Sequence, residues 1–291
     1  LRDEYGKKCD YDKVAESWEL SCHKDGPSVV ADGEYKGLTL NEYIEKAGKG
    51  VLGKNCERFE NFPILIKLID AKDNLSVQVH PDNDYAMRVE GEYGKTEMWY
   101  VVDCDEGATL LYGFKHEITK EEFARRIADN TLLEVTNAVP VKKGDVFFIK
   151  SGTLHAIGKG ILIAEIQQNS NTTYRIYDYG RVGKDGKPRE LHVNKALDVT
   201  KLAPAEQYPE TPVEKKDGYD IKLLSKCEYF TTYRVNVETK AELDADENSF
   251  NSILVLEGEP VISGGETVSA KKGESVFISA GTGKYTVEGK C

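Results

Sequence analysis

Two stretches of this chain repeat one residue pattern, and this repeat constrains the fold more than any other feature. Residues 142–155 read KKGDVFFIKSGTLH and residues 271–284 read KKGESVFISAGTGK, and the two align without a gap. A glycine turn, a short apolar run and a second glycine turn are typical of a β-strand between two turns. Repetition at this scale indicates a duplicated β-fold. The first copy ends in His155 and the second in Lys284, a poor metal ligand, so we expect a site in the first half only.

The rest of the chain alternates short apolar runs with Gly and Asp turns, and helix signals are few. Capping boxes or amphipathic spacing predict helices from 39 to about 48, from 119 to about 130, and over 191–199. Apolar runs predict strands at 64–69, 76–80, 97–103, 109–112, 146–149, 161–166, 173–177, 221–224, 230–237, 252–257, 276–279 and 284–287. The fold class expected is mainly β, with two β-barrel or jelly-roll units and a few short helices.

A change in composition divides the chain. Residues 201–219 contain three prolines and several charges, a pattern typical of a linker. We therefore expect a first domain over residues 1–200, a linker over 201–219 and a second domain over 220–291. Only the first of these domains is expected to bind metal.

Composition excludes several classes of function. The net charge is −11 and the pI is about 5.1, which argues against nucleic acid as a partner because phosphate backbones need a basic face. No apolar stretch is long enough to span a membrane, and the first residues do not resemble a signal peptide. The six cysteines are scattered with no C-x-x-C pair, which fits a reducing cytoplasm better than a disulfide framework.

Strand alternation places polar side chains on one face in the segment 76–80. Ser76, Gln78 and His80 share one face, whereas Val77 and Val79 share the other. A hydroxyl, an amide and an imidazole are unusual inside a β-barrel. This face either contacts solvent or lines a polar cavity, and the segment alone favours neither.

Two further segments carry polar faces in the same half of the chain. In 94–102, Lys95, Glu97 and Trp99 share a face, and a surface ion pair is the simplest interpretation of the two charges. The turn after 144–149 presents His155. Period-two polar residues follow at Glu165, Gln167 and Asn169, and again at Arg175, Tyr177 and Tyr179.

Taken together, these faces offer ligands for a metal ion. Gln78, His80, Glu97 and His155 supply two imidazoles, one carboxylate and one amide oxygen. Two histidines and a carboxylate suit Zn²⁺, or Fe²⁺ with open coordination positions. The sequence spacing alone is weak evidence, because no local H-E-x-x-H motif is present.

Several long motifs, in order, resemble one known family. SVQVHPD (76–82), GKTEMWY (94–100), GTLHAIGKG (152–160) and EIQQNSNTTYRIYDYGR (165–181) look like type I mannose-6-phosphate isomerase in its short bacterial form, a member of the cupin superfamily. The resemblance covers almost the whole chain and implies two cupin-type jelly-roll barrels. It implies one Zn²⁺ per chain, bound by Gln78, His80, Glu97 and His155.

The resemblance also implies roles for residues around the metal. Arg175 is expected to be the active-site arginine, and Glu165 and Lys95 are expected to line the catalytic pocket, either of them as the proton shuttle. Substrate-binding residues are expected at Lys67, Arg181 and Ser76. The implied reaction interconverts mannose 6-phosphate and fructose 6-phosphate through a zinc-stabilised cis-enediol(ate), so the partner is a small sugar phosphate and the enzyme a monomer or homodimer.

The sequence departs from the family pattern in three places. The family's opening Trp-Gly-Gly segment is absent, Lys150 stands for the usual proline, and the chain ends before an expected final strand; we expect both end segments to lie outside this sequence. Two alternatives stay open. One is a metal-free cupin that binds sugars or regulates. The other keeps the metal and is an Fe²⁺ oxygenase or an isomerase of a different sugar phosphate.

Overall fold

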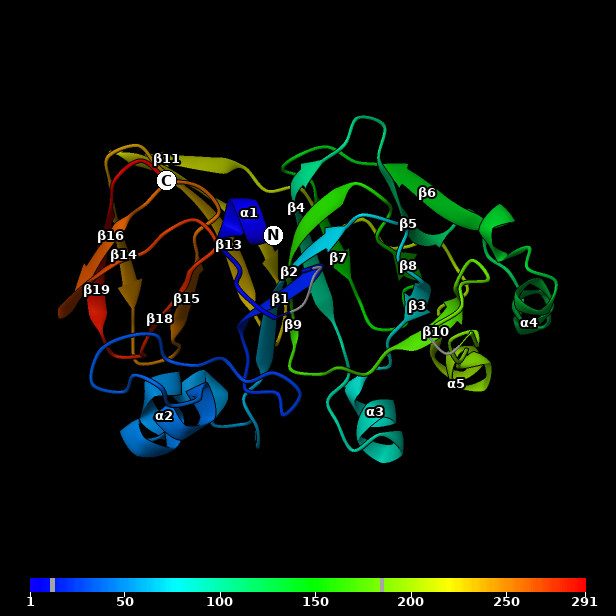
Figure 1. Ribbon diagram of the computed structural model, residues 1–291, viewed down its shortest axis with the longest axis horizontal. Helices are drawn as coiled ribbons and strands as arrows, with labels where there is room; N and C mark the ends of the chain where they lie inside the picture. The colour runs from blue at the N-terminus through cyan, green and yellow to red at the C-terminus, as the bar shows by residue number, and fades with distance from the viewer. Residues whose placement is uncertain (11–13, 184–185) are drawn as a thin grey trace. The chain divides into compact units, whose positions relative to one another are not determined.

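The computed structural model describes residues 1–10, 14–183 and 186–291, and in these ranges β-strands dominate (Figure 1). The α-helices are all short: α1 Arg2–Tyr5, α2 Leu40–Ala47, α3 Asn83–Val89, α4 Lys120–Ala128 and α5 Val193–Val199. Three single turns of 3₁₀-helix accompany them: η1 Lys49–Leu52, η2 Lys54–Cys56 and η3 Leu132–Glu134. None of the helices among these residues is long and apolar enough to cross a membrane.

Capping explains where the longer helices begin. At α2 the expected capping box is present: the Thr39 hydroxyl accepts the Glu42 N–H, and the Glu42 carboxylate accepts the Thr39 N–H. Thr119 caps α4 in the same way through the Glu122 N–H. These two helices and α5 confirm the sequence prediction. Helix α3 was not predicted; it begins after Asp82, whose carboxylate accepts the Tyr85 N–H at 2.9 Å.

The strands divide between two compact units. The central unit is Ile69–Tyr208, and the terminal unit comprises Leu1–Leu68 and Pro209–Cys291. Strands of the central unit are β3 Val77–Val79, β4 Glu97–Cys104, β5 Thr109–Phe114, β6 Thr136–Pro140, β7 Val146–Ile149, β8 His155–Ala156, β9 Ile161–Gln168 and β10 Tyr174–Tyr177. Strand β2 (Ile64–Ala71) crosses the division, with Ile69–Ala71 in the central unit.

The central unit is built from two antiparallel layers with apolar packing around them. Strands β9, β4 and β7 lie side by side in one layer, and β10, β3, β8, β5 and β6 follow in that order in the other. Helices α4 and α5 cover the outside of the second layer, where Phe123, Ile127 and Ala196 pack against Val77 and Val79. The opposite face of β3 is therefore the one that points into the unit.

The terminal unit has its own sheets and its own core. Its strands are β1 Glu16–Leu20, β11 Val213–Lys216, β12 Tyr219–Lys226, β13 Thr231–Val237, β14 Lys240–Ala245, β15 Asn251–Leu254, β16 Val261–Gly264, β17 Glu266–Ser269, β18 Ser275–Ile278 and β19 Gly283–Glu288. Strands β11 to β19 pair as β11-β12-β13, β14-β19-β16-β17 and β15-β18, and β1 pairs with β2. Val237, Ile262 and Tyr285 are among the residues of the core.

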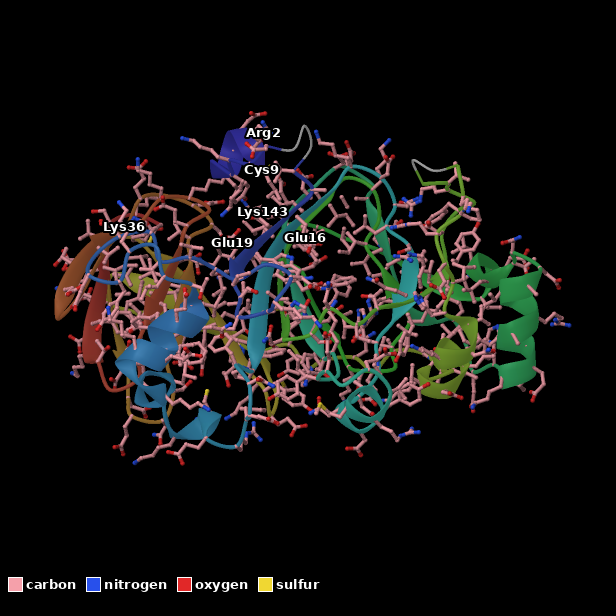
Figure 2. The ribbon with its side chains drawn as sticks, turned by 60° about the horizontal axis from the view of Figure 1, so that its bottom comes forward. Arg2, Cys9, Glu16, Glu19, Lys36 and Lys143 are labelled. Carbon is pink, nitrogen blue, oxygen red and sulfur yellow. The ribbon has the colours of Figure 1, made fainter. Side chains whose placement is uncertain are left out.

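Early and late parts of the sequence pack together in the terminal unit. Phe62 stacks on Phe250 at 5.5 Å between ring centroids, and the Tyr43 hydroxyl lies 3.0 Å from that of Ser279. Figure 2 shows Glu16 and Glu19 along β1, where Glu19 receives a hydrogen bond from Lys7. Residues 1–68 therefore group by packing with the C-terminal strands, whereas the sequence-based division assigned them to the first domain.

The stretch expected to be a linker is ordered at both ends. Ala203 accepts a backbone hydrogen bond from Phe114 in the central unit, and Tyr208 packs its ring against Phe148 there. Val213–Lys216 forms β11 and pairs with β12 in the terminal unit. In the described residues the hydrogen-bonded ladders form separate sheets and do not close into barrels.

Candidate metal centre and active site

Three side chains from distant parts of the sequence converge inside the central unit. The Nε2 atoms of His80 and His155 are 3.1 Å apart. Glu97 Oε1 lies 3.3 Å from His155 Nε2, and Glu97 Oε2 lies 3.7 Å from His80 Nε2. Ligand atoms at zinc's bond length of about 2.0–2.1 Å in a tetrahedron are roughly 3.3 Å from one another. The three groups can therefore hold one small cation.

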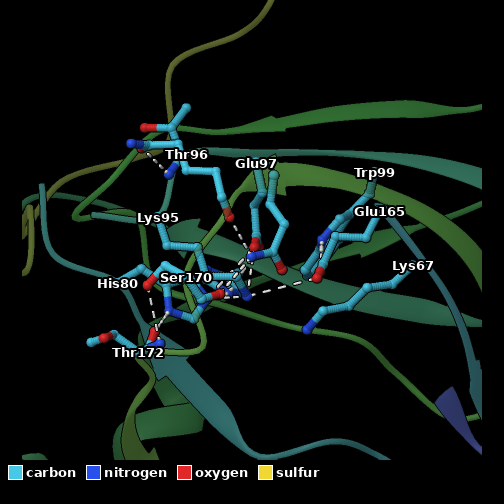
Figure 3. Close-up of polar contacts among 12 residues, drawn as sticks. Lys67, His80, Lys95, Thr96, Glu97, Trp99, Glu165, Ser170 and Thr172 are labelled. Atoms are coloured by element: carbon cyan, nitrogen blue, oxygen red, sulfur yellow. Dashed lines mark hydrogen bonds and ion pairs between the residues drawn. The ribbon is translucent and has the colours of Figure 1, made fainter. Parts of the chain in front are cut away.

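Backbone carbonyls fix the orientation of both imidazoles. The Nδ1 of His80 lies 2.9 Å from the Thr172 carbonyl oxygen, and the Nδ1 of His155 lies 2.8 Å from that of Thr153 (Figure 3 shows the former). Since a carbonyl only accepts, each Nδ1 carries the hydrogen and each Nε2 presents a lone pair to the centre. Burial lowers the pKa of His155 to about 4, which keeps this ring neutral and able to bind a cation at neutral pH.

Strand pairing explains how these residues meet. Strand β8 pairs with β3 so that Gln78 lies opposite His155, and His80 follows two residues later on the same face. Glu97 begins β4 in the facing layer. The polar face of 76–80 therefore lines the interior, and the valines pack under the helices, which resolves the two interpretations left open by the sequence. Gln78 lies beside the centre, and its role as fourth ligand stays a prediction.

Lys95 and Glu165 complete a buried charged network. The Lys95 ammonium is 2.9 Å from Glu97 Oε2, 3.2 Å from His80 Nε2 and 3.7 Å from Glu165 Oε1. The expected ion pair between Lys95 and Glu97 is thus present, but its expected place on the surface was wrong, since both residues are buried. The reason is that both faces of β4 are buried inside the unit, including the face that carries Glu97.

Gly94 allows this lysine to reach the centre. A Cβ at Gly94 would lie 2.4 Å from the Asp82 carbonyl carbon and 2.5 Å from the Asn83 nitrogen, so only glycine permits this approach of two backbones. The Lys95 N–H then bonds to the Pro81 carbonyl at 3.0 Å, directly after His80. The local chain path places Lys95 beside a metal ligand.

Arg175 lies on β10, directly opposite Gln78 on β3. Its Nη1 donates to the Glu190 carbonyl at 3.1 Å, and its backbone N–H donates to His192 Nδ1 at 3.1 Å. Burial, followed by the neighbouring Arg189, lowers the pKa of Arg175 from its usual value. Its register places it next to a candidate ligand, and its role as the active-site arginine stays a prediction.

Arg181 is bound within an arginine–carboxylate cluster. The Asp178 carboxylate accepts hydrogen bonds from Arg181 Nη2 at 2.5 Å and from Arg189 Nη2 at 2.5 Å, and Arg181 Nη1 donates to the Asn74 carbonyl. Burial opposes ionisation of Asp178, but the two arginines outweigh it and lower the pKa. Arg189 was not among the site residues predicted from the sequence.

The remaining predicted substrate-binding residues occupy different places. Ser76 is buried just before β3 in the central unit. Lys67 belongs to the terminal unit, where its ammonium is 3.4 Å from Glu16 and 4.9 Å from the centroid of the Trp18 ring. Both assignments stay predictions from the resemblance.

Two backbone groups that support the site were missed by sequence reasoning, whereas Gln167 was already placed on a polar face. The carbonyls of Thr153 and Thr172 have no signature in the sequence, because any residue type supplies a carbonyl. The Gln167 amide donates to the carbonyls of Gln168 and Ser170, both at 2.7 Å, and so shapes the turn that leads to Thr172. Its period-two position after Glu165 was the only available signal.

Comparisons with known proteins identify the family of this chain. Residues 6–107 match the catalytic domain of type I phosphomannose isomerase, and residues 220–291 match the cupin domain of mannose-6-phosphate isomerase. The mannose-6-phosphate isomerase ManA of Bacillus subtilis is 39% identical over 98% of this chain and 90% of its own length. The chain belongs to the type I phosphomannose isomerase family.

A second relative and a crystal structure support membership of the same family. The mannose-6-phosphate isomerase of Streptococcus mutans is 39% identical over 96% of this chain and 86% of its own length. A crystal structure of mannose 6-phosphate isomerase from Bacillus subtilis superposes with a TM-score of 0.93 at 38% identity, covering 100% of this chain and 92% of that one. The prediction of a mainly β cupin fold is therefore confirmed.

Proposed function

We propose that this chain is a zinc-dependent aldose–ketose isomerase that interconverts mannose 6-phosphate and fructose 6-phosphate. The observation that carries the proposal is the convergence of His80, Glu97 and His155 on one point, joined to Lys95 and Glu165 in a single buried network. Membership of a family whose relatives are named for this reaction supports the choice of substrate. Gln78 is proposed as the fourth ligand.

The donor set fits a divalent metal. Two neutral imidazoles and one carboxylate are ligands of catalytic Zn²⁺ sites, which keep a position for substrate. A divalent cation bound there supplies Lewis acidity, which makes a proton next to a carbonyl easier to remove. Our choice of zinc over iron rests on the resemblance.

The isomerisation needs a group that moves a proton between C1 and C2 through a cis-enediol(ate). Glu165 is our candidate, because its carboxylate is buried and one of its oxygens lies 3.7 Å from the Lys95 ammonium. Lys95 lies between Glu165 and Glu97 and is placed to donate hydrogen bonds to oxygens that gain negative charge. Arg175, a permanent cation, is proposed to hold a substrate oxygen and not to carry the proton.

The phosphate requires cations inside an otherwise acidic protein. Arg181 is proposed for this role, and Ser76 as a hydroxyl donor, whereas the assignment of Lys67 stays a prediction from the resemblance. Because Asp178 holds the Arg181 guanidinium, this group would be oriented before the phosphate binds. The six cysteines are free thiols, which supports the proposal of a cytoplasmic location. We also propose that the enzyme is a monomer or a homodimer.

One assay tests the function. Purified protein is supplied with mannose 6-phosphate, and fructose 6-phosphate is measured by a coupled enzyme, before and after chelation and after addition of Zn²⁺. We expect activity that the chelator removes and zinc restores, with about one metal per chain. Activity that persists without metal would contradict the metal role. Oxygen consumption on iron loading would favour the oxygenase, and absence of both activities would favour the binding module.

A further inference from the structure

A buried hydrogen bond joins the candidate proton shuttle to a tryptophan that no proposed role yet includes. The Trp99 indole Nε1–H donates to Glu165 Oε2 at 2.8 Å, and both side chains are buried (Figure 3). The other carboxylate oxygen, Oε1, is the one that lies 3.7 Å from Lys95. The two oxygens of Glu165 therefore have different partners.

Sheet register places this donor. Trp99 on β4 lies directly opposite Glu165 on β9, and Glu97 lies opposite Gln167 one step along the same face. Directly opposed residues of an antiparallel pair have their side chains on the same side of the sheet, in contact. The strand that supplies a metal ligand thus supplies a partner for Glu165 two residues later.

Packing holds the indole ring in place. Trp99 is wholly buried in an apolar cluster with Val101 and Ile163. Its ring meets that of His155 edge to face, with centroids 5.2 Å apart and planes at 83°. A phenylalanine could fill much of the same apolar space, but only tryptophan adds an N–H that points at the carboxylate. A ring packed on both sides has little freedom to follow a moving carboxylate.

We propose that Trp99 is a positioning residue, which holds one oxygen of Glu165 so that the other faces Lys95 and the substrate. The proposal rests on the proposed function for its kinetic consequence only. A carboxylate that transfers protons must present one oxygen at hydrogen-bond distance, and a rigid donor on the second oxygen removes the rotations that would turn it away. The donor also favours the charged carboxylate, the form that accepts a proton.

The first test is Trp99→Phe, which removes the N–H and keeps an aromatic ring. We expect kcat to fall by about 10- to 100-fold, as for loss of a hydrogen bond to a charged group. KM and the metal content should stay within about twofold of wild type. The acid limb of the kcat profile should move to higher pH, because Glu165 would lose a donor that favours its charged form.

Tyr112→Phe is the matched control. Tyr112 belongs to the same apolar cluster, is also buried, and donates its hydroxyl to the carbonyls of Phe148 at 2.8 Å and Glu206 at 3.1 Å. This variant also loses one buried donor, so it should lower the thermal midpoint without changing kcat or the pH profile. If Trp99→Phe only lowers the midpoint, as the control does, the tryptophan is structural and the proposal is wrong.

A second measurement needs neither activity nor a tryptophan variant. The chain has two tryptophans, Trp18 and Trp99, so a proton–nitrogen spectrum shows two indole signals. Glu165→Gln should shift the Trp99 signal and leave that of Trp18 unchanged. An unmoved Trp99 signal would overturn the pairing itself. If the wild-type protein lacks isomerase activity but Glu165→Gln still shifts the Trp99 signal, the proposed function is refuted and the pairing of Trp99 with Glu165 stands.

Discussion

The two copies of the repeated segment have nearly the same backbone and different chemistry. In the central unit, Gly144 has φ 93° and its N–H bonds to the Val101 carbonyl at 2.8 Å. In the terminal unit, Gly273 has φ 88° and its N–H bonds to the Val255 carbonyl at 2.7 Å. A second glycine turn follows in each copy, with φ 85° and 80°.

The carboxylate of the first turn has the same role in both copies. Asp145 Oδ2 accepts the Lys142 N–H at 2.9 Å, and Glu274 Oε2 accepts the Lys271 N–H at 2.8 Å. Aspartate and glutamate differ by one methylene, yet both reach back three residues to an amide. What the copies share is therefore the turn chemistry that forms the strand.

The copies differ at the residue that the second turn presents. His155 is buried and faces Glu97, whereas Lys284 is exposed and forms an ion pair with Glu242 at 2.8 Å. The residue before it differs as well: Leu154 is buried in the core, whereas Gly283 has φ 73°. The backbone of this motif supports a metal ligand but does not require one.

The largest expected effect separates the copies by function. His155→Ala should reduce metal affinity and isomerase activity together by more than about 100-fold, because loss of even an outer partner of a ligand costs 10- to 100-fold. Lys284→Ala, at the equivalent position, should change neither. Metal analysis after dialysis and the coupled assay measure both. Equal losses in the two variants would mean that the copies are not functionally distinct.

The next effect separates the copies by packing. A Cβ at Gly152 would lie 2.8 Å from the Val199 carbonyl oxygen, whereas one at Gly281 meets nothing within 4 Å. Both positions have positive φ, so Gly281→Ala should cost about 1 kcal/mol of unfolding free energy and Gly152→Ala about 3 kcal/mol. Denaturant unfolding measures both. Similar costs would show that helix α5 moves away to accept the methyl group.

Acid sensitivity is expected to follow the buried histidine. The pKa of His155 is lowered from 6.5 to about 4, so the unfolded chain binds this proton more readily than the folded one. Stability is therefore complete above pH 6.5 and falls as the pH drops toward 4. Chelated protein should lose roughly 2 kcal/mol more than chelated His155→Gln between pH 7 and pH 5. Equal losses in denaturant titrations of the two proteins would contradict the low pKa.

The smallest effect concerns the exposed lysine. Lys284→His should change stability by less than about 0.5 kcal/mol, because exposed ion pairs contribute little. It should also recruit no zinc, since one exposed imidazole beside Glu242 is a poor site. Zinc titration by calorimetry measures this. Tight binding would show that the second copy has kept a hidden ligand set.

The local elements of the fold were predictable because their signals are local. Thr39 and Thr119 each precede a glutamate by three residues, and both begin helices as predicted. Helix α3 was missed because Asp82 follows a strand, a histidine and a proline and has no glutamate partner three residues later. A lone cap gives a weaker signal than a reciprocal pair.

The site was predictable as a set of residue types but not as an arrangement. Alternation placed His80 with Gln78 and Lys95 with Glu97, but it did not say which face of each strand was inside. That depends on α4 and α5 covering Val77 and Val79, a contact between residues far apart in the sequence. The pairing of Trp99 with Glu165 depends likewise on the register of β4 and β9, which alternation within one strand cannot give.

Strand β3 is enclosed by hydrocarbon on one side and by charged groups on the other. Sliding it by a single position against either neighbour would put an isopropyl group where the imidazole now points and would push an amide and an imidazole beneath the helices. Either change alone would cost folding free energy, because a buried polar group without a partner and an apolar group at a polar site are both unfavourable. Substitutions in this segment leave the register unchanged, whereas an insertion or deletion of one residue here should abolish enzyme activity.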